Sequence, residues 1–180
     1  MSPEQKEFLA KRFKEFYVPG LNQLKSKLMA IDGKMMVPQP EHKADVHRLL
    51  NYGQIFPTTK LTCKRGLPNR CHSNAARLWC QTNNTQLVSG YALATDELWR
   101  QHSWLWDPKK QRIIETTHQF LQYFGATLEQ HELLKFIMAN CPEMANQPTA
   151  KLTKNVNQWV ATNRQAQETL ANTKTCPQKS

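Results

Sequence analysis

The segment RCHSNAARLW, residues 70–79, places a cysteine next to a histidine at what the pattern predicts to be a helix start. Free N–H groups and the helix dipole favour negative charge at such a position, so they would help to ionise a thiol. A cysteine nucleophile also needs a histidine to move its proton and a third group to orient that histidine. Cys71 is therefore the candidate nucleophile.

Two histidines compete as the partner of Cys71. His72 is adjacent in sequence, but consecutive helical side chains point about 100° apart, which predicts a poor partner on the flank of the helix. His102 begins a predicted strand in QHSWLW and is the better candidate. The other histidines occur in helical or boundary segments with no evident polar cluster: His42, His47, His118 and His131.

The third group follows from a predicted hairpin. If DPKK, residues 107–110, forms the turn, Trp106 faces Gln111 and His102 faces Glu115. Facing residues lie on the same side of a sheet, close enough for a carboxylate to hold an imidazole. A shift of one residue would move Glu115 to the other face. Asp107, at the turn and on the opposite face by alternation, is the second choice.

Each of these residues also has an ordinary structural interpretation. A single cysteine in a helix is usually a small buried residue, and a glutamate at a strand end is usually solvated. A zinc site could join Cys63, Cys71, His72 and Cys80, but zinc ligands normally come in closely spaced pairs. The cysteine, histidine and acid occur in the order that a catalytic triad uses, which favours catalysis without metal or cofactor.

The surrounding pattern predicts the elements that must position these residues. Helices are expected at 3–17, with Ser2 as N-cap, at 21–31 and at 41–53, and residues 54–69 are predicted to be an irregular loop. Pro68 and Asn69 are expected to precede and cap the Cys71 helix. Strands follow at 85–93, 102–106 and 111–117. The remaining segments are a helical pattern at 118–139 broken at Gly125, a proline-bearing connection at 141–150 and a polar helix at 152–172.

This order predicts an α+β fold, with a small antiparallel sheet flanked by helices. The 180 residues suit one domain over 1–172, made of a helical part (1–53), a catalytic core (about 54–117) and a second helical part (118–172). Residues 173–180 are expected to be a frayed tail. Gly20, Gly53 and the VPQP segment at 37–40 mark the expected ends of the early elements.

Composition limits the classes of function. The formal net charge is +10, but the basic residues are spread along the chain, so we expect solubility and weak non-specific polyanion binding. Five irregularly spaced cysteines, at 63, 71, 80, 141 and 176, do not suggest a disulfide framework. No secretory signal or membrane-spanning apolar run is evident, so a cytoplasmic protein without membrane association is expected.

The segments RCHSNAARLW, VSGYAL and QHSWLWDPKKQRIIETT together resemble the core of the transglutaminase-like cysteine enzymes, within the wider papain-like group. They are similar as well to small bacterial and phage proteins of undefined role that share CHxNA…GYA…HxWL. The resemblance covers about 68–117. It implies a papain-like core with Cys71 as nucleophile at a helix N-terminus, His102 as base and Glu115 as acid. Glutamate replaces the more usual aspartate, and Arg70 replaces an aromatic residue.

The chemistry expected of this triad is acyl transfer through a thioester. The backbone N–H of Cys71 and a second donor, Gln54 or Asn69, would hold the oxyanion. Trp104 should share the face of His102, where it would line the site or act as a core residue. Water as acceptor gives a protease, amidase or glutamine deamidase, and an amine gives a transamidase, with a protein or peptide as the expected substrate. The alternative is a non-catalytic basic module that docks an acidic protein or nucleic acid.

Overall fold

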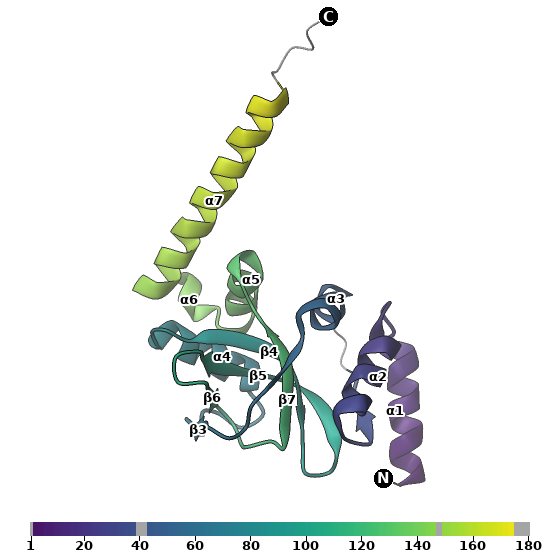
Figure 1. Ribbon diagram of the computed structural model, residues 1–180. Coiled ribbons are helices and arrows are strands. Elements are labelled where there is room, and N and C mark those ends of the chain that lie inside the picture. Colours follow the sequence, from purple (N-terminus) through teal and green to yellow (C-terminus); the bar gives the residue numbers. More distant parts are fainter. Residues whose placement is uncertain (1, 39–42, 147–148, 175–180) are drawn as a thin grey trace, which may run out of the picture. The chain divides into compact units, whose positions relative to one another are not determined.

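A curled sheet runs through the first part of the chain (Figure 1) in the computed structural model, which describes residues 2–38, 43–146 and 149–174. The chain divides into two units, residues 1–128 and 129–180, where the sequence predicts one domain over 1–172. Each unit is described by itself. The mixed α+β class predicted from the sequence is confirmed by the helices and strands of the first unit.

The sheet has strand order β2-β7-β4-β5-β6-β3, and β1 pairs in parallel with β5. The central pairs β4–β5, β4–β7 and β5–β6 are antiparallel, whereas β3 and β6 are parallel. The strands are β1 (Met35–Met36), β2 (Gln54–Phe56), β3 (Leu61–Cys63), β4 (Gln86–Leu93), β5 (Leu98–Asp107), β6 (Arg112–Glu115) and β7 (Gln122–Thr127).

The helices of the first unit are α1 (Pro3–Glu15), α2 (Leu21–Ile31), α3 (Lys43–Tyr52) and α4 (Cys71–Gln81). The predicted N-cap of α1 is confirmed, because the Ser2 side chain accepts from the Gln5 N–H and Gln5 returns the bond. Leucines spaced along α2, such as Leu24 and Leu28, pack with Trp99 and Phe124 of the sheet. The predicted range of α2 is confirmed at both ends.

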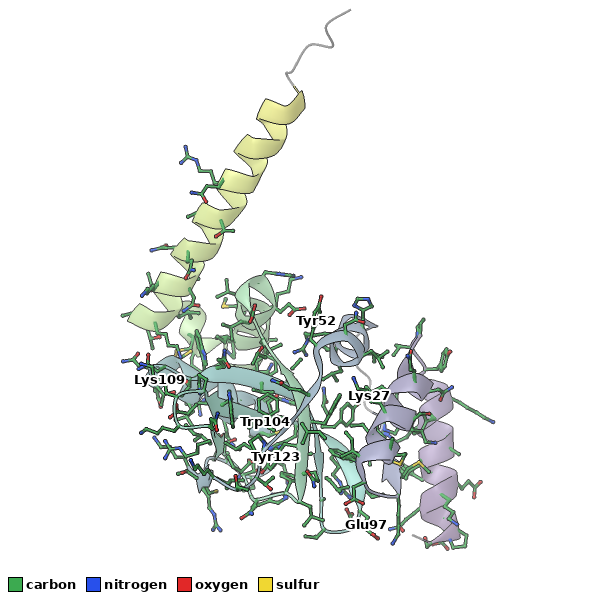
Figure 2. The ribbon with its side chains drawn as sticks, in the orientation of Figure 1. Lys27, Tyr52, Glu97, Trp104, Lys109 and Tyr123 are labelled. Atoms are coloured by element: carbon green, nitrogen blue, oxygen red, sulfur yellow. The ribbon has the colours of Figure 1, made fainter. Side chains whose placement is uncertain are left out.

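The opposite face of the sheet has an aromatic core. Trp104 and Tyr123, which lie together in the middle of the sheet (Figure 2), meet edge to face with ring centroids 5.1 Å apart. Phe56 packs edge-on against Trp104 at 5.5 Å, and Phe120 belongs to the same cluster. His102 projects from this face, so the candidate base lies at the margin of a rigid aromatic cluster.

The second unit is helical, with α5 (Gln130–Asn140), α6 (Glu143–Asn146) and α7 (Ala150–Lys174). Helices α5 and α7 contact each other, and Leu133, Ile137 and Leu152 are buried. The predicted polar helix at 152–172 lies within α7, and the predicted tail at 173–180 falls mostly outside the described residues. Among the helices described, none is both long and apolar enough to cross a bilayer.

Two sequence predictions about secondary structure are wrong. The expected loop at 54–69 contains β2 and β3, strands of three residues each at the outer ends of the sheet. Such short strands carry no measurable periodicity, and Pro57 and Gly66 dominate the pattern. The expected helix at 118–139 instead contains β7, followed by α5.

Gly125 explains the second error. It reads as a break in a helix, but it lies inside β7, where a Cβ atom would be 2.7 Å from the Trp104 ring and 2.9 Å from the Val88 side chain. The glycine therefore permits a close approach within the sheet, which is the other common reason for glycine in a strand.

Candidate functional site

The helix that carries Cys71 begins without a side-chain cap. Arg70 is its N-cap residue, with φ −120° and ψ 39°, and its side chain makes no capping hydrogen bond. The prediction that Asn69 caps this helix is wrong, since Asn69 has the left-handed φ of 55° and an exposed side chain. The N–H groups of the first turn are thus not capped by a side chain, at the point where Cys71 begins the helix.

The loop before Cys71 is tied to the end of β6. The Lys64 N–H donates to the Glu115 carbonyl and the Gly66 N–H donates to the Thr116 carbonyl, both at 2.7 Å. These bonds continue the parallel β3–β6 pairing beyond Cys63. They place the chain that leads into α4 directly beside the residue predicted as the acid.

Asn74 clamps the same loop to α4. Its side chain accepts from the Leu67 N–H at 3.1 Å and donates to the Leu67 carbonyl at 2.7 Å, so it satisfies both backbone groups of one loop residue. The side chain is buried against Gly66, where a Cβ atom would be 2.4 Å from the Asn74 amide carbon. The bare Gly66 backbone therefore gives Asn74 the space that this clamp needs.

The first turn of α4 meets β5 where that strand has an open edge. On the edge away from β4, β1 pairs with Leu98 and Trp99, and β6 pairs from Leu105 onward. Residues 100–104 have no strand partner there within the described ranges. His72 contacts Ser103 at this segment, with 2.8 Å between Nδ1 and Oγ, and Cys71 is hydrogen-bonded to His102. Because neighbouring strand residues point to opposite faces, the start of α4 contacts side chains on both faces of β5.

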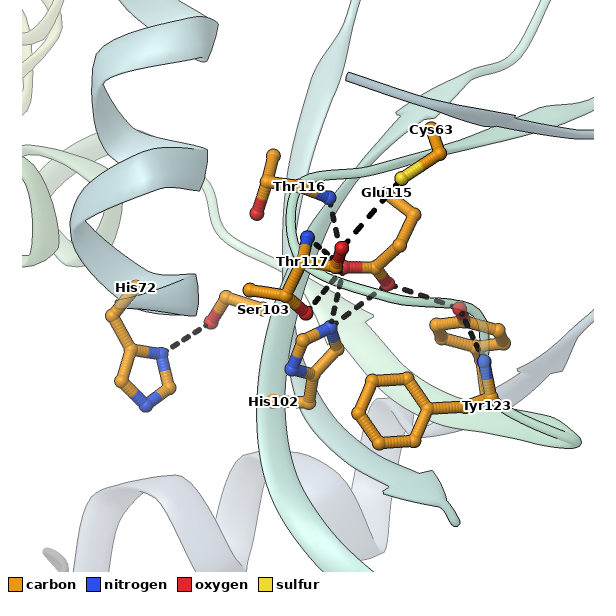
Figure 3. Close-up of polar contacts among 9 residues, drawn as sticks. Cys63, His72, His102, Ser103, Glu115, Thr116, Thr117 and Tyr123 are labelled. Carbon is orange, nitrogen blue, oxygen red and sulfur yellow. Dashed lines mark hydrogen bonds and ion pairs between the residues drawn. The ribbon is translucent and has the colours of Figure 1, made fainter. Parts of the chain in front are cut away.

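His102 is hydrogen-bonded to the Cys71 thiol and also to a buried carboxylate, that of Glu115, and Figure 3 shows the contact with Glu115. Its Nε2 lies 2.9 Å from Oε2 and 3.1 Å from Oε1 of Glu115. Because Nε2 is occupied by the carboxylate, Nδ1 is the ring nitrogen left for Cys71. The structure therefore brings together the three residues that the sequence singled out: Cys71, His102 and Glu115.

The predicted hairpin register is wrong by two residues, although the predicted faces are right. Asp107 pairs with Arg112 and Leu105 with Ile114, so the turn comprises residues 108–111 and Gln111 has a left-handed φ of 47°. Residue 107 extends β5, where the sequence places it in the turn. An even shift preserves the face of every side chain, so Glu115 still projects toward His102, along a diagonal.

Glu115 is fully buried, and five donors surround its carboxylate. Oε1 accepts from the Thr116 N–H, the Thr117 N–H and the Thr117 hydroxyl at 2.8 to 3.0 Å, besides His102. Oε2 accepts from the Tyr123 hydroxyl at 2.9 Å. Tyr123 is itself fixed, because its oxygen accepts from the Phe120 N–H at 3.2 Å. This saturated environment holds the carboxylate as an anion of fixed orientation.

The pKa values of the three residues are shifted in a consistent direction. Burial raises the pKa of the Cys71 thiol, but hydrogen bonds from His102 and His72 outweigh it and lower the pKa from 9.0 to about 5. Burial lowers the pKa of His102, but its bonds to Cys71 and Glu115 raise it from 6.5 to about 9. Burial also raises the pKa of Glu115, and the bond from His102 leads the effects that lower it overall. At neutral pH the site therefore holds a thiolate beside an imidazolium.

The interpretation of His72 as a poor partner is wrong. Its side chain is hydrogen-bonded to Cys71 as well as to Ser103, and the buried Ser103 hydroxyl fixes the ring. An angle of about 100° between consecutive side chains separates their directions, but it does not prevent contact between a long ring and a thiol on the same turn.

The supporting residues predicted from the sequence have different fates. Trp104 shares the face of His102 as expected, is fully buried, and stacks on the imidazole with 6.1 Å between ring centroids and 17° between planes. Gln54 is exposed on β2, three strand steps from His102, or about 14 Å along the sheet. Asp107 accepts from the Lys110 N–H and pairs with Arg112 at the turn, away from the triad.

The four residues of the alternative zinc site do not converge on one point, although Cys71 and His72 contact each other. In the described part of the chain, no three side chains of the metal-ligating types converge in a group that could hold an ion. None of the four described cysteines takes part in a disulfide: Cys63, Cys71, Cys80 and Cys141. Cys63 is exposed and its sulfur lies 3.7 Å from the Thr117 carbonyl, whereas Cys80 is buried. Cys176 lies outside the described residues.

Several positioning residues escaped the sequence analysis. Asn74 and Gly66 are visible in the sequence, but their contact depends on how the loop after β3 lies beside the end of β6. Ser103 and Tyr123 contact the site from β5 and β7, and Tyr123 was placed in a predicted helix. Alternation along β5 could have shown that Ser103 faces away from His102, but only the position of α4 shows what it meets.

Comparison with known proteins gives no relative for this chain. No protein-family model matches it, and neither a curated protein nor a solved structure does so. The function therefore has to be argued from the geometry: a thiolate at an uncapped helix start, a buried imidazolium and a carboxylate with a saturated shell of donors. In this set the thiolate can attack an electrophilic carbon, and the imidazolium can transfer a proton to or from a group bonded to that carbon.

Proposed function

We propose that the protein is a cysteine-dependent acyl-transfer enzyme that uses Cys71, His102 and Glu115 as a triad in a papain-like core. The observation that carries the proposal is the continuous chain of hydrogen bonds from the thiol through the imidazole to the buried carboxylate. A buried carboxylate that accepts five hydrogen bonds and contacts a buried histidine has no evident use in a purely structural core, because burying its charge costs desolvation energy.

The proposed reaction begins with the ion pair of Cys71 and His102. The Cys71 sulfur attacks an amide carbonyl carbon, the C–N bond breaks, and the leaving amine takes the proton from the His102 imidazolium. This leaves a thioester on Cys71 and a neutral His102. Water then gives a proton to His102 and attacks the thioester, which releases the carboxylic acid and restores the thiolate. An amine in place of water gives a transamidation.

Glu115 and the helix start serve the charged states of this cycle. Glu115 stabilises the imidazolium and keeps Nδ1 directed toward the sulfur. The oxyanion would be held by the uncapped N–H groups at the start of α4, among them that of Cys71. Gln54 lies too far along the sheet to be the second donor, whereas Asn69 and the backbone of Arg70 precede Cys71 directly.

Alkylation with iodoacetamide, followed by peptide mapping, tests the pairing. We expect Cys71 to react at pH 6, and the His102→Ala variant to lose at least ten-fold of that rate. The exposed Cys63 provides an internal reference in the same sample. The alternative, a non-catalytic binding module, predicts the same Cys71 profile in both proteins.

Acyl transfer itself can be followed with p-nitrophenyl acetate as donor. The proposal predicts a hydroxylamine-sensitive acetyl group on Cys71 that turns over, as seen by intact-protein mass spectrometry. The matched variant Cys63→Ser should behave as the wild type, whereas Cys71→Ser should not be acetylated at position 71. Acetylation that is equally fast in wild type and His102→Ala would rule out His102 as the base.

A further inference from the structure

A basic groove runs beside the helix that carries Cys71. Its volume is about 570 Å³, and the loop residues Lys64 and Arg65 line one part of it. The residues of α4 that line it are Asn74, Arg77, Leu78 and Gln81. None of the described residues that line the groove is acidic, and Lys64 and Arg65 bring positive charge to it.

The groove lies on the nucleophile's side of α4. At about 100° per residue, all four lining positions of α4 fall within about 120° on one side of the direction of Cys71. His72 points about 100° to the other side, toward Ser103. Asn74 lines the groove only one helical turn from Cys71, about 4.5 Å along the axis. A chain that follows the groove toward the start of α4 therefore approaches the thiol.

The groove also offers polar groups for a ligand. Thr116 lines it and is 1% exposed, and its Oγ1 has no hydrogen-bond partner among the described residues. This hydroxyl points from the residue that follows β6 toward α4 (Figure 3). A buried hydroxyl without a partner is costly unless a ligand or water satisfies it. The apolar Leu67 side chain is 58% exposed beside the cationic residues, which suits a peptide better than a small anion.

We propose that this groove docks an acidic segment of the protein whose acyl group Cys71 attacks. The inference rests on the proposed function, and it adds the chemistry of the substrate: carboxylate side chains close to the reacting carbonyl. Lys64 and Arg65 have exposed side chains, so they attract such a segment through solvent and raise the rate of encounter. Binding therefore weakens as salt screens these charges.

Fluorescence anisotropy with a labelled hexaglutamate peptide tests the groove directly. We expect Lys64→Glu combined with Arg65→Glu to weaken binding at least ten-fold. The matched control, Lys109→Glu with Lys110→Glu, changes the net charge equally at the exposed turn between β5 and β6 and should change binding less than three-fold. Figure 2 shows Lys109 at this margin of the molecule. Circular dichroism checks that each variant is folded.

A second variant keeps the proposal testable if the double variant unfolds. Gln81→Glu adds one negative charge at an exposed position of α4 and should weaken binding at least three-fold. Equal losses in the groove and turn variants would overturn the proposal, because they would show attraction by net charge alone. Tighter binding of an oligonucleotide of equal charge would also overturn it.

The Cys71→Ser variant separates this inference from the proposed function. It should bind the hexaglutamate peptide as the wild type does, because the groove residues are unchanged. Peptide binding without acylation of Cys71 would contradict the proposed function but not the proposal about the groove. Acylation of Cys71 without peptide binding would contradict the groove alone.

Discussion

Glu115 reaches His102 along a diagonal of the sheet, not across a directly facing pair. The observed β5–β6 register pairs Leu105 with Ile114, so its next step would set Glu115 beside Trp104, two residues from His102 on the same face. Diagonal neighbours are separated by about 7 to 8 Å, against about 5 Å for facing pairs. The longer glutamate side chain spans this distance and still ends 2.9 Å from Nε2. The geometry thus suits the length of a glutamate side chain at this position.

The first prediction follows from this reach. Glu115→Asp shortens the side chain by one methylene, so the carboxylate should lose His102 although its charge is kept. We expect the pH at which Cys71 reacts half-maximally to rise in Glu115→Asp and in the uncharged Glu115→Gln. Alkylation rates measured from pH 4 to 10 provide the test. A Glu115→Asp profile that matches the wild type would show that the diagonal geometry is unimportant.

The second prediction concerns stability against pH, and the two shifted pKa values act in opposite directions. The raised pKa of His102 contributes stability that is complete below pH 6.5 and lost as the pH rises to about 9. The lowered pKa of Cys71 contributes stability that is gained as the pH rises from about 5 to 9.0. The two cancel between pH 6.5 and 9, since each state then holds one proton on the pair.

The net contribution of this pair is a rise in stability between about pH 5 and 6.5. At about 1.4 kcal/mol per pH unit, this window contributes about 2 kcal/mol to the free energy of unfolding. Urea unfolding at several pH values measures it. Because Cys71→Ser removes the thiol titration, it should flatten the rise, whereas Cys63→Ser should not. An identical slope in wild type and Cys71→Ser would contradict the ion pair.

The sequence predicts the triad because its three members come from elements with strong patterns. The Cys71 helix begins within a residue of its expected start, and alternation along β5 places His102 and Trp104 on one face. The predicted turn is wrong, but Glu115 still lies on the predicted face because the register error is an even number of residues. A register error of one residue would have moved the carboxylate to the far side of the sheet.

The parts that the sequence does not predict depend on long-range pairing. The strands β2 and β3 have three residues each, and only their partners β7 and β6 make them strands. Tyr123 reads as part of a helix because Tyr, Phe and Leu recur at helical spacing around it, but β4 and β2 pair with β7 on both edges. Tertiary contacts thus override local propensity at β7, the strand whose Tyr123 donates a hydrogen bond to Glu115.

The third prediction concerns the clamp between Asn74 and Leu67. Asn74→Ala removes both hydrogen bonds to the Leu67 backbone and should lower the free energy of unfolding by about 2 to 3 kcal/mol. Gly66→Ala should act similarly, because its Cβ would lie within 2.7 Å of three Asn74 side-chain atoms. Both variants should also slow alkylation of Cys71, since the loop that leads into α4 would shift.

Urea unfolding and Cys71 alkylation at pH 6 measure the two effects together. Asn51→Ala serves as a control, because Asn51 makes an exposed bond to His47 on α3, and it should change neither quantity. A loss of stability in Asn74→Ala with unchanged Cys71 reactivity would show that the clamp supports the fold without positioning the nucleophile.

The last prediction separates the two histidines at Cys71. Both are hydrogen-bonded to the thiol and both lower its pKa, and the hydrogen bond from His102 is the largest single cause of the lowering. Of the two histidines, His102 is the one that also contacts Glu115, whereas His72 contacts the neutral Ser103 hydroxyl. We therefore expect His72→Ala to raise the pH of half-maximal Cys71 alkylation by less than His102→Ala does.

His72→Ala should keep turnover of the acetyl group, and His102→Ala should lose it, because a base oriented by a carboxylate is needed to deprotonate water. Ser103→Ala should resemble His72→Ala. If His72→Ala abolished turnover and His102→Ala did not, His72 would be the base, and the carboxylate behind His102 would need another explanation.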